Sequence, residues 1–355
     1  MKKWLTGIVF MIMAMMVLTA CGGDKAEETE TPEKTDGAAD PVVEAESDEY
    51  EESTIRLAYN LPQDHHISIG IEKFAEDVKE KSGGKIDMQV FPAGQLLSDK
   101  DMNQSLLSGG VEMGVNSSTL WSSTVPAMGI FDVPYVFNDY SAVGEAVGGE
   151  FGDKLRSAMA DKGAEVLMFA DYGFVQFANN KLELKSPADF KGLKIRSIGD
   201  LPSELIKAYG ASPVFMGGGE VYMALQRDTV DGATSGTTAM LQRKYDEVTK
   251  YLTINNYAYL EFLLTVNKDF WDKLPEKSQA LISETAAEAE VWIRSQAEKE
   301  DVDSAKALEE AGMQVYYVPE DELAVWKEAA EPVRGIFVDN AGELGKELLD
   351  MVDGN

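Results

Sequence analysis

Cysteine and histidine are nearly absent from this chain. Its 355 residues include one cysteine, Cys21, and two histidines, His65 and His66. A single cysteine excludes a disulfide framework and a zinc or redox site built on a cysteine pair. Two adjacent histidines provide little material for a histidine-based metal site or a catalytic triad. We therefore expect neither a metal ion nor a cofactor.

Positive charge is scarce as well. The sequence has 32 Lys and Arg against 62 Asp and Glu, which gives a formal net charge of -30 at pH 7. The resulting negative field repels nucleic acid and anionic lipid, so we expect neither as a partner of the folded part. With 44% hydrophobic and 9% aromatic residues, the chain can still form two ordinary domains with proper cores.

The N-terminal segment has the pattern of a bacterial secretion signal. Lys2 and Lys3 precede an apolar run that ends in the sequence LTAC at positions 18–21. This pattern predicts a signal peptide at residues 1–20 and lipidation of Cys21, and hence an extracytoplasmic protein that its lipid anchors to the cell membrane. An uncleaved anchor is the alternative, but a run of about 15 residues is short for a hydrocarbon core of about 30 Å.

The next segment is acidic and poor in large apolar residues. Residues 21–52 therefore lack the surface that a folded core has to bury, and we expect a disordered tether. A flexible chain of about 30 residues has an end-to-end distance of roughly 30 Å, which lets a folded body move beside a membrane. A tail without any role has the same composition and is the alternative.

The folded part begins with alternating strand-like and helix-like segments. TIRLAYNL at positions 54–61 alternates apolar and polar residues, and the segment that follows keeps Ile71, Phe74 and Val78 at helical spacing. The same alternation continues and then resumes after residue 164, which predicts an α/β fold with parallel, doubly covered sheets. The run from Pro275 to about Ala311 lacks glycine and internal proline, and predicts about 50 Å of helix at 1.5 Å per residue.

Polar residues at the ends of expected strands are candidate ligand contacts. In open α/β sheets, ligands bind at the carboxyl ends of the strands. Asn60 ends the first expected strand, and Asn116 and Ser117 end a later one. Ordinary turn and helix-capping roles are the alternative for these side chains.

Arg196 lies in the segment FKGLKIRSIGD at positions 190–200 of this acidic chain. Three interpretations are open for it: a surface charge, one half of a structural ion pair, or a receptor for an anion from outside. A planar guanidinium offers paired donors that match a carboxylate, and it stays charged when buried.

Five sequence segments follow one another in a characteristic order. They are IEKFAEDVKEKSGGKI, FPAGQLLSDKDMNQSLLSGGVEMG, FKGLKIRS, GASPVFM, and GEVYMALQRDTVDGATSG followed by YDEVTKYLT. Together they resemble the extracytoplasmic solute-binding subunit of tripartite ATP-independent periplasmic (TRAP) transporters, of the dicarboxylate-binding-protein (DctP) type. The likeness runs from about Thr54 to near the C-terminus.

The resemblance implies a binding protein and not an enzyme. Its fold is the two-lobed, type II-like periplasmic-binding-protein fold, with two doubly wound α/β domains, hinge strands and a long helix that spans both lobes. It implies that the protein closes on a small organic anion and delivers it to a TRAP membrane permease. We expect lobe I at residues 53–173 and 262–301, and lobe II at residues 174–261 and 302–355.

The resemblance also implies roles for single residues. Arg196 matches the family arginine that pairs with the ligand carboxylate, while Asn60, Asn116 and Ser117 match frequent contacts. Where many members have a second arginine, this chain has Gln176, or Val175 if a one-residue gap is allowed, and we expect Gln176 to contact the ligand beside Arg196. That departure removes one positive charge, leaves Arg196 without an equal partner and favours a monoanion over a dicarboxylate.

Further positions of the expected pocket are small or aromatic. Ser235 stands where other members place an asparagine, and glycines fill positions 217–219, where some members have an aromatic wall, so we expect a roomier pocket. Aromatic residues near the lobe edges are candidates for packing on an apolar part of the ligand, and core packing is the alternative for each. They are Trp121, Tyr172, Phe174 and Tyr222.

Two other interpretations concern function and the histidine pair. A hydrolase on an α/β scaffold lacks support, because the sequence has no GxSxG elbow, Cys-His pair or metal motif. A surface lipoprotein that senses ligand with the same fold is the alternative to transport. We expect His65 and His66 to be solvated loop residues, with ligand contact or pH sensing as the alternative.

Overall fold

The computed structural model describes residues 50–354. The predicted signal peptide, the predicted lipidation site Cys21 and nearly all of the predicted tether lie outside the described residues. Within the described range, no helix is both long enough and apolar enough to cross a membrane.

A nine-stranded sheet runs through the described part, in the order β2-β1-β3-β8-β4-β7-β5-β6, with β9 beside β8. At one end, β1 (Ser53–Tyr59) pairs in parallel with β2 (Ile86–Phe91) and β3 (Met113–Ser117). The alternating apolar residues expected in the first strand, among them Ile55 and Leu57, are fully buried. Their burial is what fixes the register of this edge.

The other end of the sheet repeats the parallel arrangement. There β5 (Lys194–Ser197) pairs with both β6 (Ser212–Phe215) and β7 (Gly232–Gly236). Ile195 and Ala233 are buried at the centre of this group. Each half is therefore a short parallel sheet, as the alternation of strand and helix predicts.

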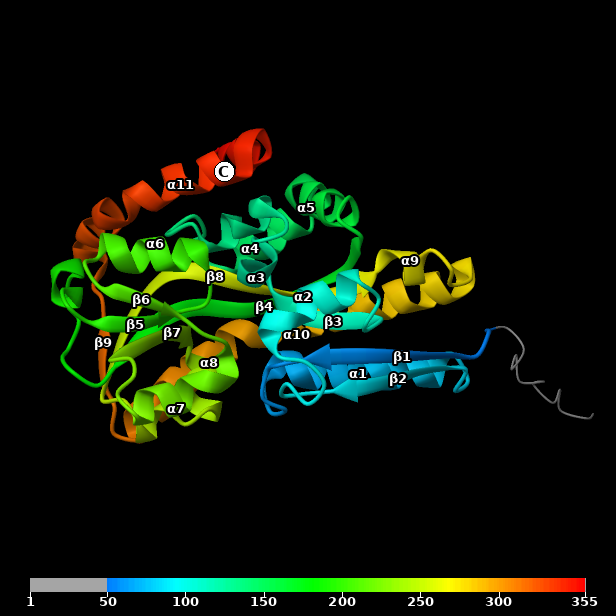
Figure 1. Cartoon of the computed structure of the whole chain (residues 1–355), viewed down its shortest axis with the longest axis horizontal. Coiled ribbons are helices and arrows are strands. Elements are labelled where there is room, and N and C mark those ends of the chain that lie inside the picture. The colour runs from blue at the N-terminus through cyan, green and yellow to red at the C-terminus, as the bar shows by residue number, and fades with distance from the viewer. Residues whose placement is uncertain (1–49, 355) are drawn as a thin grey trace, which may run out of the picture. The chain divides into compact units, whose positions relative to one another are not determined.

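Two long antiparallel strands join the halves (Figure 1). They are β4 (Ala164–Asn179) and β8 (Tyr251–Asn267), which pair along nearly their whole length. Strand β8 pairs with β3 through residues 262–266, and β4 pairs with β7 through residues 175–179. Strand β9 (Gln314–Tyr317) adds to β8 near its start.

The pairing of β4 with β8 is interrupted by irregularities. Register shifts lie between Val166 and Met168, between Asp171 and Gly173, and between Val175 and Phe177. Such bulges bend and twist the paired strands. Gly173 has φ of 104°, a conformation that side chains rarely adopt. The bends therefore lie close to where the two halves of the sheet meet.

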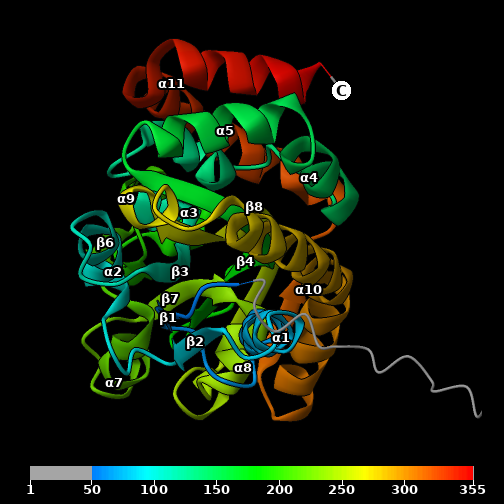
Figure 2. The same ribbon diagram turned by 90° about the vertical axis from the view of Figure 1, so that its right-hand side faces the viewer.

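Helices cover both faces of the sheet, as Figures 1 and 2 show together. On one face, α10 packs against α1, α8 and strand β4. On the other face, α11 packs along α6 and the 3-10 helix η1. The long helix predicted from Pro275 to about Ala311 is confirmed as α10 (Glu276–Glu310).

The remaining bounds complete the architecture. The helices are α1 (His66–Lys81), α2 (Asp99–Leu107), α3 (Ser118–Trp121), α4 (Tyr140–Val147), α5 (Glu150–Ala160), α6 (Asp200–Ala208), α7 (Val221–Gln226), α8 (Thr237–Gln242), α9 (Lys268–Trp271) and α11 (Leu323–Asp353). The 3-10 helices are η1 (Pro126–Asp132), η2 (Pro187–Phe190), η3 (Gly218–Glu220), η4 (Tyr245–Glu247) and η5 (Glu320–Glu322). The predicted α/β architecture with its long late helix is confirmed.

Helix α11 contacts structure that the predicted boundaries assign to different lobes. Its Trp326 packs edge-to-face on Phe190 and Tyr209, with ring centroids 5.9 and 5.4 Å apart. Its Phe337 is fully buried and lies next to Gly129 in η1. Aromatic packing of this kind holds the helix firmly on the core. The exact division into lobes stays a prediction.

Candidate ligand-binding site

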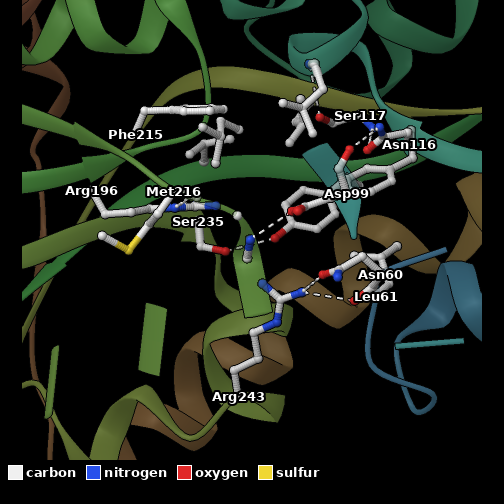
Figure 3. Close-up of a pocket in the computed structure, with 18 residues that line it drawn as sticks. Asn60, Leu61, Asp99, Asn116, Ser117, Arg196, Phe215, Met216, Ser235 and Arg243 are labelled. Atoms are coloured by element: carbon white, nitrogen blue, oxygen red, sulfur yellow. Dashed lines mark hydrogen bonds between the residues drawn. The ribbon is translucent and has the colours of Figure 1, made fainter. Parts of the chain in front are cut away.

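A pocket lies where the carboxyl ends of strands from both halves of the sheet meet (Figure 3). Strands β1 and β3 contribute from one side, and β5, β6 and β7 contribute from the other. This is the position that open α/β sheets offer to ligands. The lining residues are Asn60, Leu61, Asp99, Asn116, Ser117, Leu120, Tyr172, Val175, Arg196, Ile198, Phe215, Met216, Gly217, Gly218, Ser235, Arg243, Leu260 and Phe262.

Arg196 is a buried cation in this pocket, with 3% of its surface exposed. Its Nε donates to the carbonyl oxygen of Met216 at 3.1 Å, and its Nη1 donates to that of Thr234 at 2.7 Å. Within residues 50–354 it forms no ion pair with a carboxylate. Burial lowers the pKa of Arg196, yet a guanidinium remains protonated in proteins. Neither a surface charge nor a structural ion pair describes this buried residue, so the anion receptor is the interpretation that stays open as a prediction.

A second arginine, Arg243, enters the same pocket from the end of α8. Its Nη2 donates to the backbone carbonyl and to Oδ1 of Asn60, both at 3.3 Å. Figure 3 shows the two guanidinium groups approaching the pocket from different segments. The structure thus corrects the expectation of a single cation in the pocket, while a role of Arg243 in holding the anion is a prediction. Arg243 follows α8, the short helix after β7. In the sequence it is recognisable only as a basic residue a few positions beyond the end of an expected strand.

Of the other predicted site residues, Asn60, Asn116, Ser117 and Ser235 line the pocket. Asn116 is held by its own hydrogen bonds, because its Nδ2 donates to Asp99 O at 2.9 Å and its Oδ1 accepts from Ser117 N. Ser117 Oγ accepts from the backbone N–H of Leu120 as the N-cap of α3. The capping role that was the alternative for Ser117 thus coexists with its place in the pocket.

Gln176 does not line the pocket. Its Oε1 accepts from the backbone N–H groups of Asn255 and Asn256 at 2.9 and 3.0 Å, and its Nε2 donates to Asn256 Oδ1. The side chain therefore pairs with backbone N–H groups of β8 at the bulge after Val175, where the β4–β8 register shifts. Successive strand residues face opposite sides, so Val175 faces the pocket in its place. Of the two alternatives, Val175, which requires the one-residue gap, is therefore the residue that lines the pocket.

Two predicted aromatic contacts also lie outside the pocket. Phe174 packs edge-to-face on Tyr140 and Tyr259, with centroids 5.1 and 5.0 Å apart. Trp121 is fully buried, and its neighbour Leu120 lines the pocket. The core-packing alternative describes both residues. Of the remaining aromatic candidates, Tyr172 lines the pocket and Tyr222 donates its hydroxyl to Glu247 at 2.8 Å.

The histidine pair is buried, which corrects the expectation of solvated loop residues. His65 and His66 are 0% and 2% exposed, and their rings stack with centroids 4.5 Å apart. His65 Nδ1 accepts from Ile67 N as the N-cap of α1, and His66 Nε2 donates to Asp171 O at 2.8 Å. Burial lowers the pKa of His66 to about 4 and that of His65 well below its usual value. Neither residue lines the pocket.

The glycine loop before α7 lets two charged side chains, Asp99 and Arg243, approach its backbone closely. The expectation of a roomier pocket stays a prediction. The backbone N–H of Gly218 donates to Asp99 Oδ2 at 2.8 Å. A Cβ at Gly217 would overlap the Asp99 carboxylate, and a Cβ at Gly218 would overlap the guanidinium of Arg243. The glycines thus permit close approach across the pocket.

Charge in the pocket comes from three side chains, Arg196, Arg243 and Asp99. Two of them are cationic and one is anionic, so the lining carries a net positive charge inside a strongly acidic protein. In the part of the chain that the structure describes, no group of three His, Cys, Asp or Glu side chains is placed to hold a metal ion. The arrangement can bind an anion through hydrogen-bond donors that burial strengthens.

Comparison with known proteins identifies the family. The model of the DctP family, described as bacterial extracellular solute-binding protein, family 7, matches residues 57–338. The chain belongs to this family. It is accordingly an extracytoplasmic solute-binding protein of the TRAP type, a class of non-enzymatic transport proteins.

Curated members of the DctP family are similar over most of their length. The C4-dicarboxylate-binding periplasmic protein DctP of Rhodobacter capsulatus is 33% identical over 293 residues, which cover 81% of this chain and 87% of the relative. The 2,3-diketo-L-gulonate-binding periplasmic protein YiaO of Escherichia coli is 30% identical over 303 residues, which cover 84% of this chain and 91% of the relative.

Solved structures of TRAP solute-binding proteins share the fold. One from Sulfurospirillum deleyianum with bound succinate has a TM-score of 0.80 at 29% identity, and covers 85% of this chain and 99% of its own. The sugar acid binding protein DctPAm from Advenella mimigardefordensis, in complex with galactonate, has a TM-score of 0.82 at 27% identity, with coverage of 86% and 99%. The family resemblance in the sequence is thereby confirmed.

Proposed function

We propose that this protein binds one small organic acid, with the ligand carboxylate on Arg196, and delivers it to a TRAP membrane permease. The observation that supports this most is the buried guanidinium of Arg196, which has no carboxylate partner within residues 50–354. An unpaired buried charge is costly, and an anionic ligand would remove that cost. Each charge-assisted hydrogen bond would contribute roughly 1.5 to 3 kcal/mol.

The backbone contacts of Arg196 support a fixed orientation for the incoming carboxylate. Two of its N–H groups are engaged by carbonyl oxygens of Met216 and Thr234. A guanidinium has five N–H donors, so the outer ones are left for the ligand. A fork that is held in place before binding loses less entropy when it binds.

Contacts across the pocket support binding by closure of the two predicted lobes. Arg243 bonds to Asn60, Gly218 bonds to Asp99, and Lys100 Nζ lies 2.7 Å from Glu220 Oε2. In each pair, one residue comes from the segment before residue 101 and the other from the segment after residue 216. We propose that the ligand adds contacts from both sides, with Asn60 and Ser117 on one and Arg196, Arg243 and Ser235 on the other, and so favours the closed form.

We further propose that the mature protein is anchored through lipid on Cys21, with residues 21–52 as a tether. The support is the sequence LTAC after an apolar run, together with the absence of any other cysteine. Mass spectrometry of the mature N-terminus would show a diacylglyceryl cysteine as residue one. In a Cys21→Ala variant, the protein should leave the membrane fraction, and retention there would contradict the anchor.

Ligand identification tests the proposed function. Protein purified from its host is denatured, and the released small molecules are identified by mass spectrometry. We expect an organic acid in stoichiometric amount. Calorimetry with succinate, D-galactonate, D-glucuronate and orotate then measures affinity directly. Absence of any organic acid, both released and in titration, would contradict the proposal.

A further inference from the structure

We infer that Glu261 of β8 carries a proton that is bound when the two halves of the protein close and released when they open, so that acid strengthens the binding of the organic acid. The inference rests on the proposed function, but it concerns a buried carboxyl group outside the pocket. It adds a regulation by pH to the closure of the protein.

Glu261 lies in the part of the sheet that can bend. Strand β8 pairs with β3 through residues 262–266, and β4 pairs with β7 through residues 175–179. Between these regions, residues 171–174 of β4 and 259–261 of β8 pair only with each other in the described part of the chain. The register shift between Asp171 and Gly173 lies in the same stretch. A bulged pair of strands without further neighbours is a place where two halves of a sheet can move.

Glu261 also has another carboxyl group directly across from it. It is paired in register with Asp171, and residues opposite each other in an antiparallel pair point to the same face of the sheet. Both side chains are fully buried. Like charges in this relation destabilise a sheet, and their repulsion is strong where water is excluded. We therefore expect one of the two carboxyl groups to be neutral.

Hydrogen bonds distinguish the two carboxyl groups. Asp171 Oδ1 accepts from Tyr259 Oη at 2.7 Å, and its Oδ2 accepts from Arg294 Nε at 3.0 Å. Arg294 Nη2 also donates to Glu290 Oε1 at 3.0 Å, so two carboxylates share its charge. Neither oxygen of Glu261 has a hydrogen-bond partner within residues 50–354. An ionised Glu261 would be a buried charge without a partner, and a proton removes that cost.

The surrounding groups favour the neutral form of Glu261. Burial raises the pKa of Glu261 well above its usual value, the charge of Asp171 raises it further, and Arg294 lowers it by less. His66 donates to Asp171 O, and burial lowers the pKa of this ring to about 4, so it is neutral at pH 7. The groups that face the pair are Asp171 of β4, Tyr259 of β8, His66 of α1, Tyr140 of α4, and Glu290, Arg294 and Asp301 of α10.

Water couples this proton to closure. In the described structure the halves touch across the pocket, and Glu261 is fully buried. Bending at the bulge would admit water to the carboxyl group, and hydration favours its charged form. The pKa of Glu261 is then higher in the closed form than in the open form, so closure takes up a proton. Binding should strengthen as pH falls from the pKa of the closed form towards that of the open form.

Calorimetry tests the inference with the tightest binder among succinate, D-galactonate, D-glucuronate and orotate. Binding enthalpies in phosphate and in Tris, whose ionisation enthalpies differ, give the number of protons taken up. For the wild-type protein we expect uptake at pH 7, and affinity about threefold or more weaker at pH 8 than at pH 6. Glu261→Gln has no proton to exchange at this position, so it should bind without uptake and with similar affinity at both values. Glu165→Gln, near the start of β4, is the control and should behave as wild type.

Three results would overturn the inference: no proton uptake by the wild type, proton release, or unchanged uptake in Glu261→Gln. Each would leave the proposed function standing, because an organic acid would still bind. If none of the four acids binds and no organic acid is released on denaturation, the proposed function itself fails.

Small-angle scattering of the unliganded protein then decides the inference. We expect the radius of gyration to increase from pH 6 to pH 8 in the wild type and to stay constant in Glu261→Gln. Equal behaviour of the two proteins would overturn the inference. Circular dichroism verifies the fold of the variant, and Glu261→Met, which also cannot hold a proton, replaces Glu261→Gln if the latter does not fold.

Discussion

Arg196 Nη1 donates to the carbonyl oxygen of Thr234 at 2.7 Å, which ties the guanidinium of β5 to the neighbouring strand β7. Because a second nitrogen is held by Met216 O, the plane of the group is fixed before any ligand arrives. The orientation of the guanidinium that we propose as the anion contact is therefore set by the sheet.

The first prediction concerns Arg196→Lys. Lysine keeps the charge but loses the planar fork of donors. It therefore cannot donate to the two backbone carbonyl oxygens and at the same time bind a carboxylate through two parallel hydrogen bonds. We expect at least a 30-fold loss of affinity for the natural ligand by calorimetry, which corresponds to about 2 kcal/mol. Lys194→Gln, which removes an exposed charge on the same strand outside the pocket, serves as the control. Unchanged affinity in Arg196→Lys would refute the anchor role.

The second prediction concerns Gly217→Ala. The new Cβ meets the carboxylate of Asp99 across the pocket, whereas the backbone of Gly217 itself is ordinary, with φ of -64°. We expect at least tenfold weaker ligand binding and a smaller ligand-induced contraction in small-angle scattering, with little change in unliganded melting temperature. Gly219→Ala is a matched control, because its Cβ would have only Asn60 nearby, at 3.9 Å. Equal affinity in the two variants would contradict the idea that the glycine loop sets how far the pocket closes.

The third prediction is a pH dependence from Asp301 on α10. Burial raises the pKa of Asp301 to about 7, although Tyr140 Oη and Phe174 N donate to its Oδ2 at 2.8 and 3.0 Å. The folded protein therefore holds a proton that the unfolded chain releases near pH 4, so stability falls as pH rises from about 4 to 7. In urea unfolding, the stability of wild type relative to Asp301→Asn should be greater at pH 4.5 than at pH 8. A pH-independent difference would show that Asp301 is ionised in the folded state.

The fourth prediction has the opposite sign and concerns His66. Burial lowers its pKa to about 4, against about 6.5 in the unfolded chain, so its contribution to stability is present above pH 6.5 and is lost as pH falls towards 4. Gln at this position has no charge to gain. The stability of wild type relative to His66→Gln should thus decline from pH 7.5 to pH 5 in urea unfolding. The prediction fails if that difference stays constant or grows on acidification.

Local sequence pattern predicted much of this fold and the place of Arg196 in the pocket. The alternating apolar residues of β1 and the uninterrupted run of α10 are signals of a few neighbouring residues, so one sequence suffices to find them. Arg196 could be selected from the sequence because its segment resembles a family motif and places a positive charge between apolar residues of an acidic chain.

What the sequence did not reveal depends on tertiary placement. The choice between Val175 and Gln176 follows from a bulge in β4, and a shift of one residue moves every later side chain to the other face. Arg243 lines the pocket from the end of α8, a helix that packs on α10, far along the chain. His65 and His66 are buried because Tyr172 and Asp171 of β4 lie against them. None of these neighbours is close in sequence.

The shared central strands also govern the order in which the protein can fold during synthesis. Strand β3 pairs with β1 on one side and with β8 on the other. The hydrogen bond from Thr265 Oγ1 to Gly114 O joins β8 to β3 across 151 positions of the chain. At synthesis rates of about 5 to 20 residues per second, the edge of β3 that pairs with β8 stays unpaired for roughly 8 to 30 seconds. An unpaired strand edge is prone to aggregate. An exported chain of this topology therefore depends on being kept unfolded, or on being shielded, until its last third has emerged.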